Sequence, residues 1–389
     1  MENCNSSTSA AVHDEMKSFI EVCVTSIASL MYCYFISFNL SKGKTRVISL
    51  IPVIILFTLL PLRLHTITLT GTTGFFLHLA SLKLLLFAFG RKPLETNPPI
   101  PLTLFICIAF LPIKINHKNS TTKSNYENQE DPTKIQSENK ENIANLEHPS
   151  RKSSNPPLNL TVKCGFLGLL WIIYQFRQYI HPKIMLAYYC FYIYISTELV
   201  LAIASVMAWA SLGLELEPHF NEPYMATSLQ DFWGRRWNLV MSNALRSTVY
   251  LPMKKWVSSR SAFGSRYATV VAVMGTFVVS GLEHELMFYY FGRLRPSWEV
   301  TGFFVLQGLV VIVEIMVKKF LLMKGITWRM NRVVSGVLVI GFVMVSAMWL
   351  FFPPVLRCNT VVRTEREVTA VVESLKGSFN VLNSFVKGK

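Results

Sequence analysis

The chain has 389 residues, of which 51% are hydrophobic and only 16% are charged, whereas soluble domains carry about 25% charged residues. The apolar residues fall in long runs, so the composition excludes an ordinary soluble domain and indicates a membrane protein. The formal net charge of +15 then belongs to loops that meet anionic headgroups or an anionic substrate. No water-facing basic domain remains outside the apolar runs, so nucleic acid is not an expected partner.

The apolar runs come in lengths close to the 20 or so residues that a helix needs to cross a bilayer. Short polar or basic breaks separate them. The sequence therefore predicts an all-α polytopic bundle of about eight or nine transmembrane helices. The candidate spans are 18–40, 47–69, 72–90, 98–115, 158–176, 184–209, 267–291, 299–323 and 332–356.

Two basic clusters predict how the first spans are oriented. Lys42, Lys44 and Arg46 follow the first run, and Arg91 and Lys92 follow the third. The positive-inside rule puts both clusters on the cytoplasmic side. The second and third spans should then form a hairpin between them, with the N-terminus facing the lumen.

One low-complexity stretch divides the chain. Residues 116–157 are rich in Asn, Ser, Lys, Glu and Pro and contain few large apolar residues, which predicts a disordered polar loop. The expected organisation is therefore an N-terminal membrane region (1–115), this loop, a second membrane region that carries the polar motifs (158–356), and a C-terminal tail (357–389).

The most informative polar residues lie inside the apolar run 267–291. Thr276, Ser280 and His284 recur every fourth residue and share one stripe of a helix, with Glu283 and Glu285 beside it. Ionisable residues inside a span are costly and usually face a cavity or the protein interior. An imidazole can take a proton from a hydroxyl near neutral pH, so His284 is the expected general base. The alternative is a histidine that only hydrogen-bonds a neighbouring helix.

The two carboxylates beside His284 have different predicted roles. Glu285 is assigned to orient the ring and to stabilise the imidazolium, although the sequence does not exclude Glu283 from that task. The role of Glu283 stays open.

A second motif lies in the polar, aromatic segment 210–266. Ser228 followed by Asp231 three residues later is typical of a capping box and predicts a helix that begins near 228. One face of that helix would carry Trp233 and Trp237, which suits a helix lying at the membrane interface. Asn238 on the opposite face offers an amide that could donate to a carbonyl oxygen.

The same segment is strongly basic. Two explanations of this charge are equally good. The cations could attract anionic lipid, or they could form the entrance for an anionic donor such as coenzyme A, whose phosphates bind Arg and Lys. The residues assigned to the donor are Arg235, Arg236, Trp237 and Arg246.

Several common chemistries have no support in the sequence. The seven cysteines form no CxxC pair, and no metal site or disulfide framework is expected. GxSxG, P-loop and HExxH motifs are absent. The remaining ionisable residues in apolar runs are expected to have structural roles; they are His65, His78, Lys83, Glu198 and Glu314.

Three strings carry a resemblance to a known family. They are Asn221-x-Pro-Tyr224, the string Ser-Leu-Gln-Asp-Phe-Trp-Gly-Arg-Arg-Trp-Asn over 228–238, and Ser-Gly-Leu-x-His-Glu over 280–285. With these strings the chain resembles the plant wax synthases, a branch of the membrane-bound O-acyltransferases. The resemblance covers nearly the whole chain except 116–157 and the tail. Glu283 departs from it, since an uncharged residue such as Met is expected there.

The resemblance implies transfer of an acyl group from acyl-CoA to the hydroxyl of a lipid alcohol in the endoplasmic reticulum membrane. Long-chain alcohols and sterols are the implied acceptors, and diacylglycerol or a terpenoid alcohol is the alternative. His284 falls on the family's catalytic histidine and Asn238 on its second active-site residue. Acyl-CoA is then a co-substrate, and no bound cofactor is expected.

Two other classes of protein are weighed against this one. A transporter or channel would use intramembrane His and Glu as an ion path and predicts internal repeats with broken helices, of which the sequence gives no clear sign. A receptor or scaffold without catalysis predicts seven clean spans, and the expected span count fits it poorly. The oligomeric state stays open.

Overall fold

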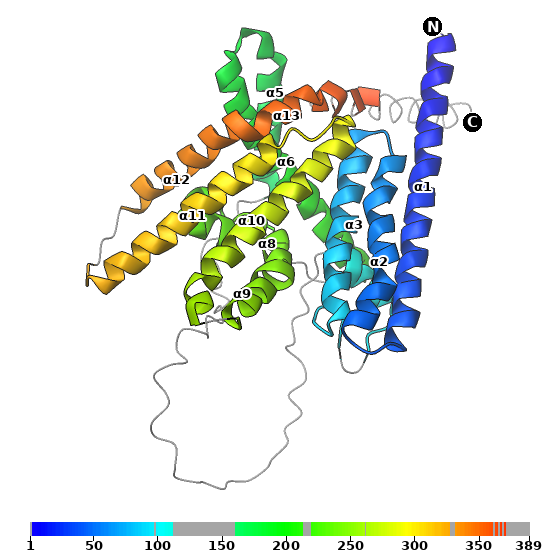
Figure 1. Cartoon of the computed structure of the whole chain (residues 1–389). Coiled ribbons are helices and arrows are strands. Elements are labelled where there is room, and N and C mark those ends of the chain that lie inside the picture. Colours follow the sequence, from blue (N-terminus) through cyan, green and yellow to red (C-terminus); the bar gives the residue numbers. More distant parts are fainter. Residues whose placement is uncertain are drawn as a thin grey trace. The chain divides into compact units, whose positions relative to one another are not determined.

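The structure is a computed structural model that describes residues 2–96, 99–111, 160–212, 219–260, 262–326, 331–360, 362–364, 366–367 and 369–370. The predicted polar loop 116–157 lies outside these residues. All regular structure in the described ranges is helical, as predicted (Figure 1). The chain forms two compact units, one of residues 1–113 with 207–389 and one of residues 114–206.

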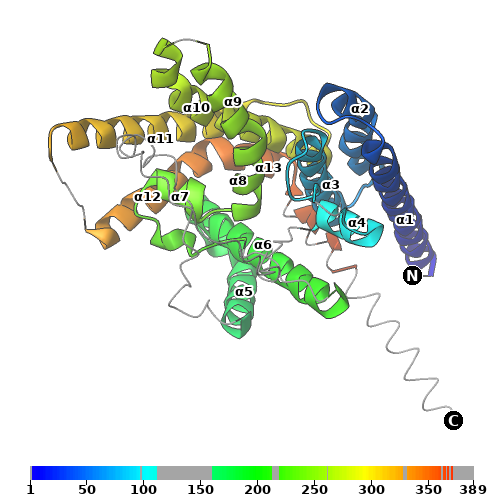
Figure 2. The ribbon, with the colours of Figure 1, turned by 90° about the horizontal axis from the view of Figure 1, so that it is seen from below.

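The larger unit holds most of the helices, which Figures 1 and 2 show from two directions. Its N-terminal part contains α1 (Glu2–Phe38), α2 (Lys44–Leu59), η1 (Leu60–Arg63), α3 (Ile67–Ala88) and α4 (Leu102–Phe110). Its C-terminal part contains η3 (Pro223–Met225), α7 (Leu229–Arg235), α8 (Leu239–Leu245), η4 (Arg246–Tyr250), α9 (Leu251–Ser258), α10 (Ala262–Gly292), α11 (Glu299–Met323), α12 (Arg332–Ser346), η5 (Ala347–Phe351) and α13 (Phe352–Arg357).

The smaller unit contains α5 (Leu160–Gln175), η2 (Arg177–Tyr179) and most of α6 (Pro182–Leu212). Its two long helices are held together by aromatic side chains. The rings of Tyr174 and Tyr188 stack with centroids 6.2 Å apart, and the Tyr188 hydroxyl donates to the Leu170 carbonyl at 3.0 Å. A tyrosine can thus bury its ring in an apolar contact while its hydroxyl finds a partner.

Seven helices in the described residues are long and apolar enough to cross a membrane. The predicted count of eight or nine is therefore not confirmed. The run at 98–115 forms only α4, which has 9 residues, because Pro99 and Pro101 oppose an earlier start of the helix. The run at 158–176 forms α5, which has 16 residues. The seven are His13–Ile36, Lys44–Arg63, Ile67–Ala88, Pro182–Ile203, Tyr267–Gly292, Glu299–Met323 and Arg332–Arg357.

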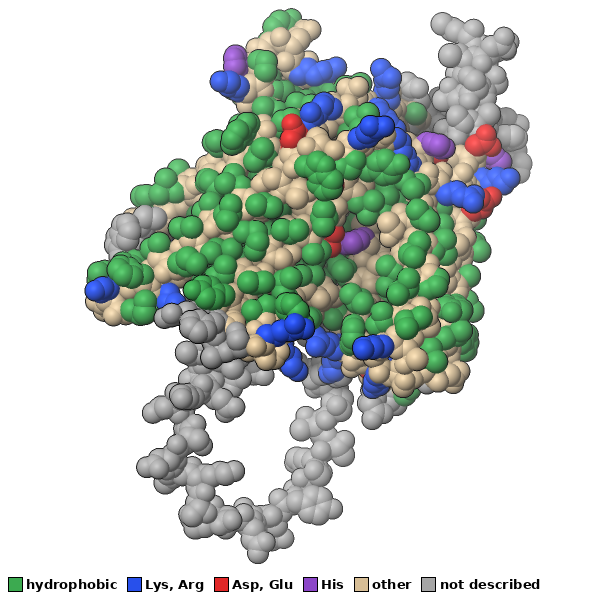
Figure 3. Space-filling model, viewed as in Figure 1, with side chains coloured by type: hydrophobic (Ala, Val, Ile, Leu, Met, Phe, Trp, Pro, Cys, Tyr) green, Lys and Arg blue, Asp and Glu red, His purple; other side chains and the backbone are tan. Residues whose placement is uncertain are grey.

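The outer faces of these helices suit lipid. On α12 and η5 the large side chains of Val337, Val345 and Trp349 are 67%, 67% and 73% exposed, which would be unfavourable in water. Figure 3 shows that the face over α10, α11 and α12 is mostly apolar, with Lys and Arg gathered near the helix ends. The protein is therefore a multi-pass membrane protein.

The predicted hairpin of α2 and α3 is confirmed, and its ends meet at the basic clusters. The Gly43 amide donates to the Ala88 carbonyl at 2.8 Å. Glu95 lies between Lys42 and Arg46, at 2.6 Å and 3.0 Å from their nitrogen atoms. One carboxylate thus neutralises two cations of the first cluster and fixes them beside the end of α3.

The break between the two spans was predicted near 70 but lies at 64–66, because α3 begins at Ile67 with two carboxylates at its N-terminus. Glu15 of α1 accepts hydrogen bonds from the His65 and Thr66 amides. Glu367, in the C-terminal tail, accepts from the Ile67 and Thr68 amides. Free amides at a helix N-terminus favour anionic partners, so residues from both ends of the sequence hold the start of α3.

Lys83 has the structural role that the sequence predicted for it. Its ammonium group is buried and donates to the carbonyls of Ile108 and Leu111 at 2.7 and 2.6 Å. These are orphan carbonyls at the end of α4, where a cation is favourable. This contact fastens the short α4 to the middle of the bundle.

The helices α10 and α11 approach each other closely near the predicted site. A Cβ atom added to Gly281 would lie 2.9 Å from the Thr301 Cα, and one added to Gly308 would lie 3.0 Å from the Phe277 Cβ. Small residues allow transmembrane helices to approach at this distance. The approach brings the N-terminal part of α11, with Phe304, against the helical turn that carries His284.

Candidate active site

His284 lies near the end of α10 with its ring held by its own helix. Its Nδ1 atom is 2.7 Å from the Ser280 carbonyl oxygen. A carbonyl can only accept a hydrogen bond, so Nδ1 carries the proton in the neutral ring and Nε2 keeps its lone pair. The predicted stripe of Ser280 and His284 is thus confirmed, with the backbone of Ser280 rather than its hydroxyl making the contact.

Aromatic rings form the walls around this imidazole. The Phe304 ring of α11 lies 4.4 Å from the His284 ring, and the Phe351 ring of η5 lies 5.9 Å away. Phe351 also contacts Phe288 and Phe303, with both centroid distances at 5.5 Å. The His284 side chain is nevertheless partly exposed, so the imidazole lies in an apolar environment without being fully enclosed.

A buried polar network supports these walls. Gln307 of α11 is fully buried; it accepts a hydrogen bond from Trp233 Nε1 at 3.2 Å and donates to the Ser346 hydroxyl at 2.8 Å. Ser346 directly precedes η5, which carries Phe351. Trp233 also packs on Phe304, with ring centroids 5.9 Å apart. Satisfied buried networks fix one arrangement of a core, so Gln307 links the tryptophan motif to both rings beside His284.

The motif around Asn238 forms two short helices, α7 and α8, instead of the single helix predicted from 228. The predicted cap is confirmed, because the Ser228 hydroxyl accepts from the Asp231 amide at 3.1 Å. The chain then breaks at Asn238, whose φ of 40° is left-handed, and the Asn238 Oδ1 atom caps α8 by accepting from the Met241 amide at 3.3 Å. Asn tolerates this conformation better than most residues.

The break gives Asn238 a defined orientation. With Oδ1 committed to the cap, the two N–H bonds of Nδ2 are the remaining polar groups of the side chain. No hydrogen bond joins Asn238 to His284 in the described structure. The two residues are connected instead through Trp233, whose ring lies against Phe304 and whose carbonyl accepts from the Ser242 hydroxyl of α8 at 3.0 Å.

Glu285 makes a contact with the next helix, and its role in orienting the His284 ring stays a prediction. It is 5% exposed and accepts a hydrogen bond from the Thr301 amide, in the first turn of α11, at 3.2 Å. The free amides at a helix N-terminus attract a carboxylate. Glu285 therefore fastens α11 to α10, one residue away from His284.

Two of the residues assigned to an anionic donor make internal contacts. Arg236 Nε lies 2.7 Å from Asp231 Oδ2, and Arg236 Nη1 donates to the Asn221 and Glu222 carbonyls at 3.3 and 3.1 Å. The Trp237 ring stacks on Phe232 at 5.4 Å. These contacts tie the strings at 221 and 228–238 together. The tryptophans of the motif face this aromatic cluster, contrary to the prediction of an interfacial helix.

The other two assigned residues are exposed. Arg235 ends α7. Arg246 begins η4 with its guanidinium over the Tyr250 ring, 5.6 Å from the centroid. Both guanidinium groups remain accessible to a phosphate.

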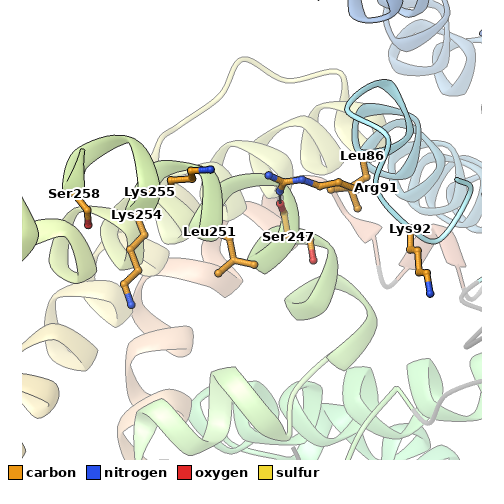
Figure 4. A pocket seen from close by; sticks show the side chains of 8 residues that line it. All are labelled: Leu86, Arg91, Lys92, Ser247, Leu251, Lys254, Lys255 and Ser258. Atoms are coloured by element: carbon orange, nitrogen blue, oxygen red, sulfur yellow. Dashed lines mark hydrogen bonds between the residues drawn. The ribbon is translucent and has the colours of Figure 1, made fainter. Parts of the chain in front are cut away.

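A basic pocket of about 610 Å³ lies between the end of α3 and the helices η4 and α9 (Figure 4). Arg91 reaches across it and donates to the Ser247 carbonyl at 3.3 Å. Four of its eight lining residues are cationic, and no acidic residue lines it. Clustered cations of this kind favour an anion with several charges. The lining residues are Leu86, Arg91, Lys92, Ser247, Leu251, Lys254, Lys255 and Ser258.

Comparison with known proteins identifies the class of molecule that carries this site. The profile of the membrane bound O-acyl transferase family matches residues 216–306, which include the Asn238 motif, His284 and the start of α11. The chain is 42% identical to the long-chain-alcohol O-fatty-acyltransferase of Simmondsia chinensis, over 91% of this chain and 94% of that protein. The chain belongs to the membrane-bound O-acyltransferase family.

Two Arabidopsis thaliana relatives are similarly close to this O-acyltransferase. Acyl-CoA–sterol O-acyltransferase 1 is 40% identical over 92% of this chain and 95% of its own length. Probable long-chain-alcohol O-fatty-acyltransferase 1 is 41% identical over 94% of this chain and 98% of its own length. The predicted family and enzyme class are confirmed, and the transporter alternative is not supported.

The part of the site that sequence reasoning missed in this acyltransferase is the side of the basic pocket that α3 contributes. Arg91 and Lys92 were interpreted only as a signal of membrane orientation, whereas Lys254 and Lys255 belong to the basic segment already noted. The positive-inside rule contained the missing signal, since cations that share one side of a membrane can share one pocket.

Proposed function

We propose that this O-acyltransferase moves the acyl group of acyl-CoA to the hydroxyl of a lipid alcohol, either a long-chain alcohol or a sterol. Its relatives include a sterol O-acyltransferase and a long-chain-alcohol O-fatty-acyltransferase, which supports both acceptors. The observation that carries the proposal is the geometry of His284: Nδ1 is bound to the Ser280 carbonyl, which leaves Nε2 as an unprotonated base among aromatic walls.

In the proposed reaction His284 Nε2 takes the hydroxyl proton as the alcohol oxygen attacks the thioester carbonyl. The new C–O bond gives a tetrahedral intermediate, whose collapse breaks the C–S bond. The coenzyme A thiolate leaves and takes the proton back from the imidazolium. The products are an ester and free coenzyme A, and no acyl-enzyme forms.

Asn238 is proposed to assist at the carbonyl oxygen of the thioester. Its Oδ1 atom caps α8, so the amide nitrogen is oriented by the cap and offers two donors to a developing oxyanion. Closure of α7 and α8 toward α10 on substrate binding would bring this amide to the reacting carbon. Glu285 is proposed to act through structure, by holding α11 and thus Phe304 against the base.

The coenzyme A portion of the donor is proposed to bind at the basic pocket. The four cations Arg91, Lys92, Lys254 and Lys255 line it, and the exposed Arg235 and Arg246 extend the positive surface. The phosphates of coenzyme A need partners of this kind. Acyl-CoA is a co-substrate in this scheme and no resident cofactor takes part.

The acceptor and the compartment are proposed from the relatives and from the resemblance. A long-chain alcohol would give a wax ester and a sterol a sterol ester, in the endoplasmic reticulum membrane. Diacylglycerol or a terpenoid alcohol is the alternative acceptor. Isolated membranes incubated with a matrix of acyl-CoAs and alcohols, followed by thin-layer chromatography, would identify the preferred pair.

The test of the mechanism is the His284→Ala variant, assayed for ester formation from radiolabelled acyl-CoA in membranes with matched protein levels. Ester formation should fall to background, because no other base replaces Nε2. His65→Ala removes an exposed histidine outside the site and should retain the wild-type rate. A His284→Ala enzyme that still forms ester at the wild-type rate would overturn the mechanism.

A further inference from the structure

The pair of His78 and Glu283 is a polar feature of the membrane interior that the mechanism above does not use. His78 Nε2 of α3 lies 2.8 Å from Glu283 Oε1 of α10. His78 is about ten residues from either end of α3, which is about 15 Å of helix. The pair therefore lies near the middle of the bilayer, where ionisable groups are costly and usually mark a functional site.

Packing between α3 and α10 does not require this pair. The two helices already approach closely at two glycines: a Cβ atom on Gly71 would lie 2.8 Å from the Phe291 ring, and one on Gly74 would lie 3.2 Å from the Tyr290 ring. His78 and Glu283 follow as the next level of the same antiparallel contact. Apolar residues at that level would close the interface at lower cost.

The pair also reaches the surface. The side chain of His78 is 28% exposed and that of Glu283 is 12% exposed. Figure 3 shows an acidic side chain and a histidine side by side over the contact between α3 and α10, within an otherwise apolar face. A molecule dissolved in the bilayer can therefore contact polar atoms at this level.

The pair has hydrogen-bonding capacity left for such a molecule. His78 Nε2 is buried and lies 2.8 Å from Glu283 Oε1, but it makes no hydrogen bond in the described part of the chain. No further partner is present there for His78 Nδ1 or Glu283 Oε2. A carboxylate only accepts hydrogen bonds, whereas an imidazole can accept or donate. A hydroxyl is both donor and acceptor, so it is the neutral lipid group that matches both atoms.

Glu283 immediately precedes the catalytic base. Neighbouring Cα atoms are about 3.8 Å apart, and consecutive helical side chains diverge by about 100°. A hydroxyl bound at Glu283 therefore lies on the face of α10 that adjoins the face carrying His284. An alcohol that moves lengthwise between the helices could pass its hydroxyl from Glu283 to His284.

We propose that the His78–Glu283 pair captures the hydroxyl of the lipid alcohol where it leaves the bilayer between α3 and α10, and delivers it to His284. The inference rests on the proposed acyl transfer and names the acceptor site within it. The pair acts in acceptor binding, and the proton transfer and the ester bond formation remain with His284 and the donor.

The test compares Glu283→Met, His78→Phe and the double variant in detergent-solubilised enzyme, with KM measured separately for alcohol and acyl-CoA. Each single variant should raise the KM for the alcohol about tenfold, the loss of one hydrogen bond to a charged group. The KM for acyl-CoA and kcat at saturating alcohol should stay near the wild-type values. Glu314→Gln, which removes a carboxylate from another span, should leave the KM for the alcohol unchanged.

The double variant separates acceptor binding from a purely structural role. It removes both polar groups, so neither is left buried without its partner, and its thermal stability should match or exceed that of the wild type. Its KM for the alcohol should nevertheless remain raised. A stable double variant with the wild-type KM for the alcohol would overturn the inference while leaving acyl transfer intact. A wild-type enzyme that forms no ester with any alcohol would overturn the proposed function itself.

Discussion

Asn238 combines a structural task with a proposed catalytic one in a single amide. Its carbonyl oxygen caps α8 and its left-handed backbone ends the turn after α7. The amide nitrogen takes no part in the cap. His284 is held in a similar way, since the Ser280 carbonyl accepts from Nδ1 and Nε2 is not used by that contact. In both side chains a backbone contact within the helix orients the atom to which the proposed mechanism assigns chemistry.

The two tasks of Asn238 can be separated by Asn238→Asp. The aspartate keeps an oxygen for the Met241 amide and tolerates a positive φ, so the thermal stability should remain near that of the wild type. It loses both N–H donors, and loss of an oxyanion donor costs about 10²–10³ in kcat. Steady-state assays and thermal unfolding of the purified variant check both expectations. A fully active Asn238→Asp enzyme would remove Asn238 from the chemistry.

His219, next to the Asn238 turn, predicts a pH dependence of stability. It is 6% exposed and its Nε2 has no hydrogen-bond partner in the described structure, and burial lowers its pKa from 6.5 to about 4. Between these values the unfolded chain binds a proton that the folded chain does not. Stability should therefore decrease as the pH falls from 6.5 toward 4, by roughly 3 kcal/mol in total, and be unaffected above 6.5.

Thermal unfolding of the wild type and of His219→Phe between pH 4.5 and pH 7.5 tests this expectation. The phenylalanine keeps an apolar ring but cannot bind a proton, so the variant should lose less stability than the wild type at the acidic end. Parallel curves for the two proteins would mean that His219 does not contribute to the acid sensitivity.

At the residue scale the sequence was informative where a contact is local. The Ser228 cap and the His284 stripe involve neighbours within one helical turn, and such pairs follow from spacing alone. The partner of Glu285 could not be predicted in the same way, because the Thr301 amide is free only at the start of another helix. His78 and Glu283 are 205 positions apart, so their approach required knowledge of which helices pack together.

At the scale of elements, the break between α7 and α8 is the main departure from the predicted fold. The helical periodicity of 228–245 is continuous, yet the backbone turns at Asn238. Contacts with a distant segment outweigh local propensity here: the Asn221 amide donates to the Arg236 carbonyl at 2.9 Å, and the Leu239 amide donates to the His219 carbonyl at 2.8 Å. These bonds replace those that a continuous helix would form. The long apolar helices were predicted well because their hydrophobic length alone determines them.

The close contact of α10 with α11 predicts that one added methyl group at Gly281 lowers both stability and activity. Gly281→Ala would place a Cβ atom 2.9 Å from the Thr301 backbone, so α11 must move, and Phe304 moves with it from the His284 ring. Overpacking of this kind costs about 1–3 kcal/mol. We expect a lower melting temperature and a lower kcat.

Gly302→Ala is the matched control for this variant. A Cβ atom at Gly302, which lies on α11 next to Thr301, would meet nothing within 4 Å, and alanine favours a helix over glycine. Thermal unfolding in detergent should show Gly302→Ala at or above the wild-type melting temperature. If Gly281→Ala matched it in stability and in kcat, the close contact would not position the base.

At the scale of the whole larger unit, charges that are distant in the sequence meet at one end of the membrane helices. Arg91 and Lys92 follow α3, whereas Lys254 and Lys255 belong to α9, and all four line one pocket. The end of α2 nearest to them is also basic, but Glu95 neutralises Lys42 and Arg46. Positive charge is therefore concentrated at the pocket, which suits the capture of a polyanion from the aqueous phase.

This arrangement predicts that the pocket recognises the phosphates of the donor and not its acyl chain. Lys254→Gln combined with Lys255→Gln should raise the KM for acyl-CoA about three- to tenfold, the effect of losing two exposed charge pairs. The KM for the acyl-pantetheine thioester, which lacks the nucleotide phosphates, should not change. High salt should raise the KM for acyl-CoA more in the wild type than in the variant, because screening acts on the pairs that the variant has lost.

Lys319→Gln is the matched control for the double variant, since Lys319 is an exposed cation of α11 that does not line the pocket. Its KM for acyl-CoA should equal that of the wild type. An equal rise with acyl-CoA and with acyl-pantetheine in the double variant would show that the lysines support the fold of α9 rather than the phosphates. In that case the donor would have to enter beside Arg235 and Arg246. Charge reversal at those two arginines would then raise the KM for acyl-CoA.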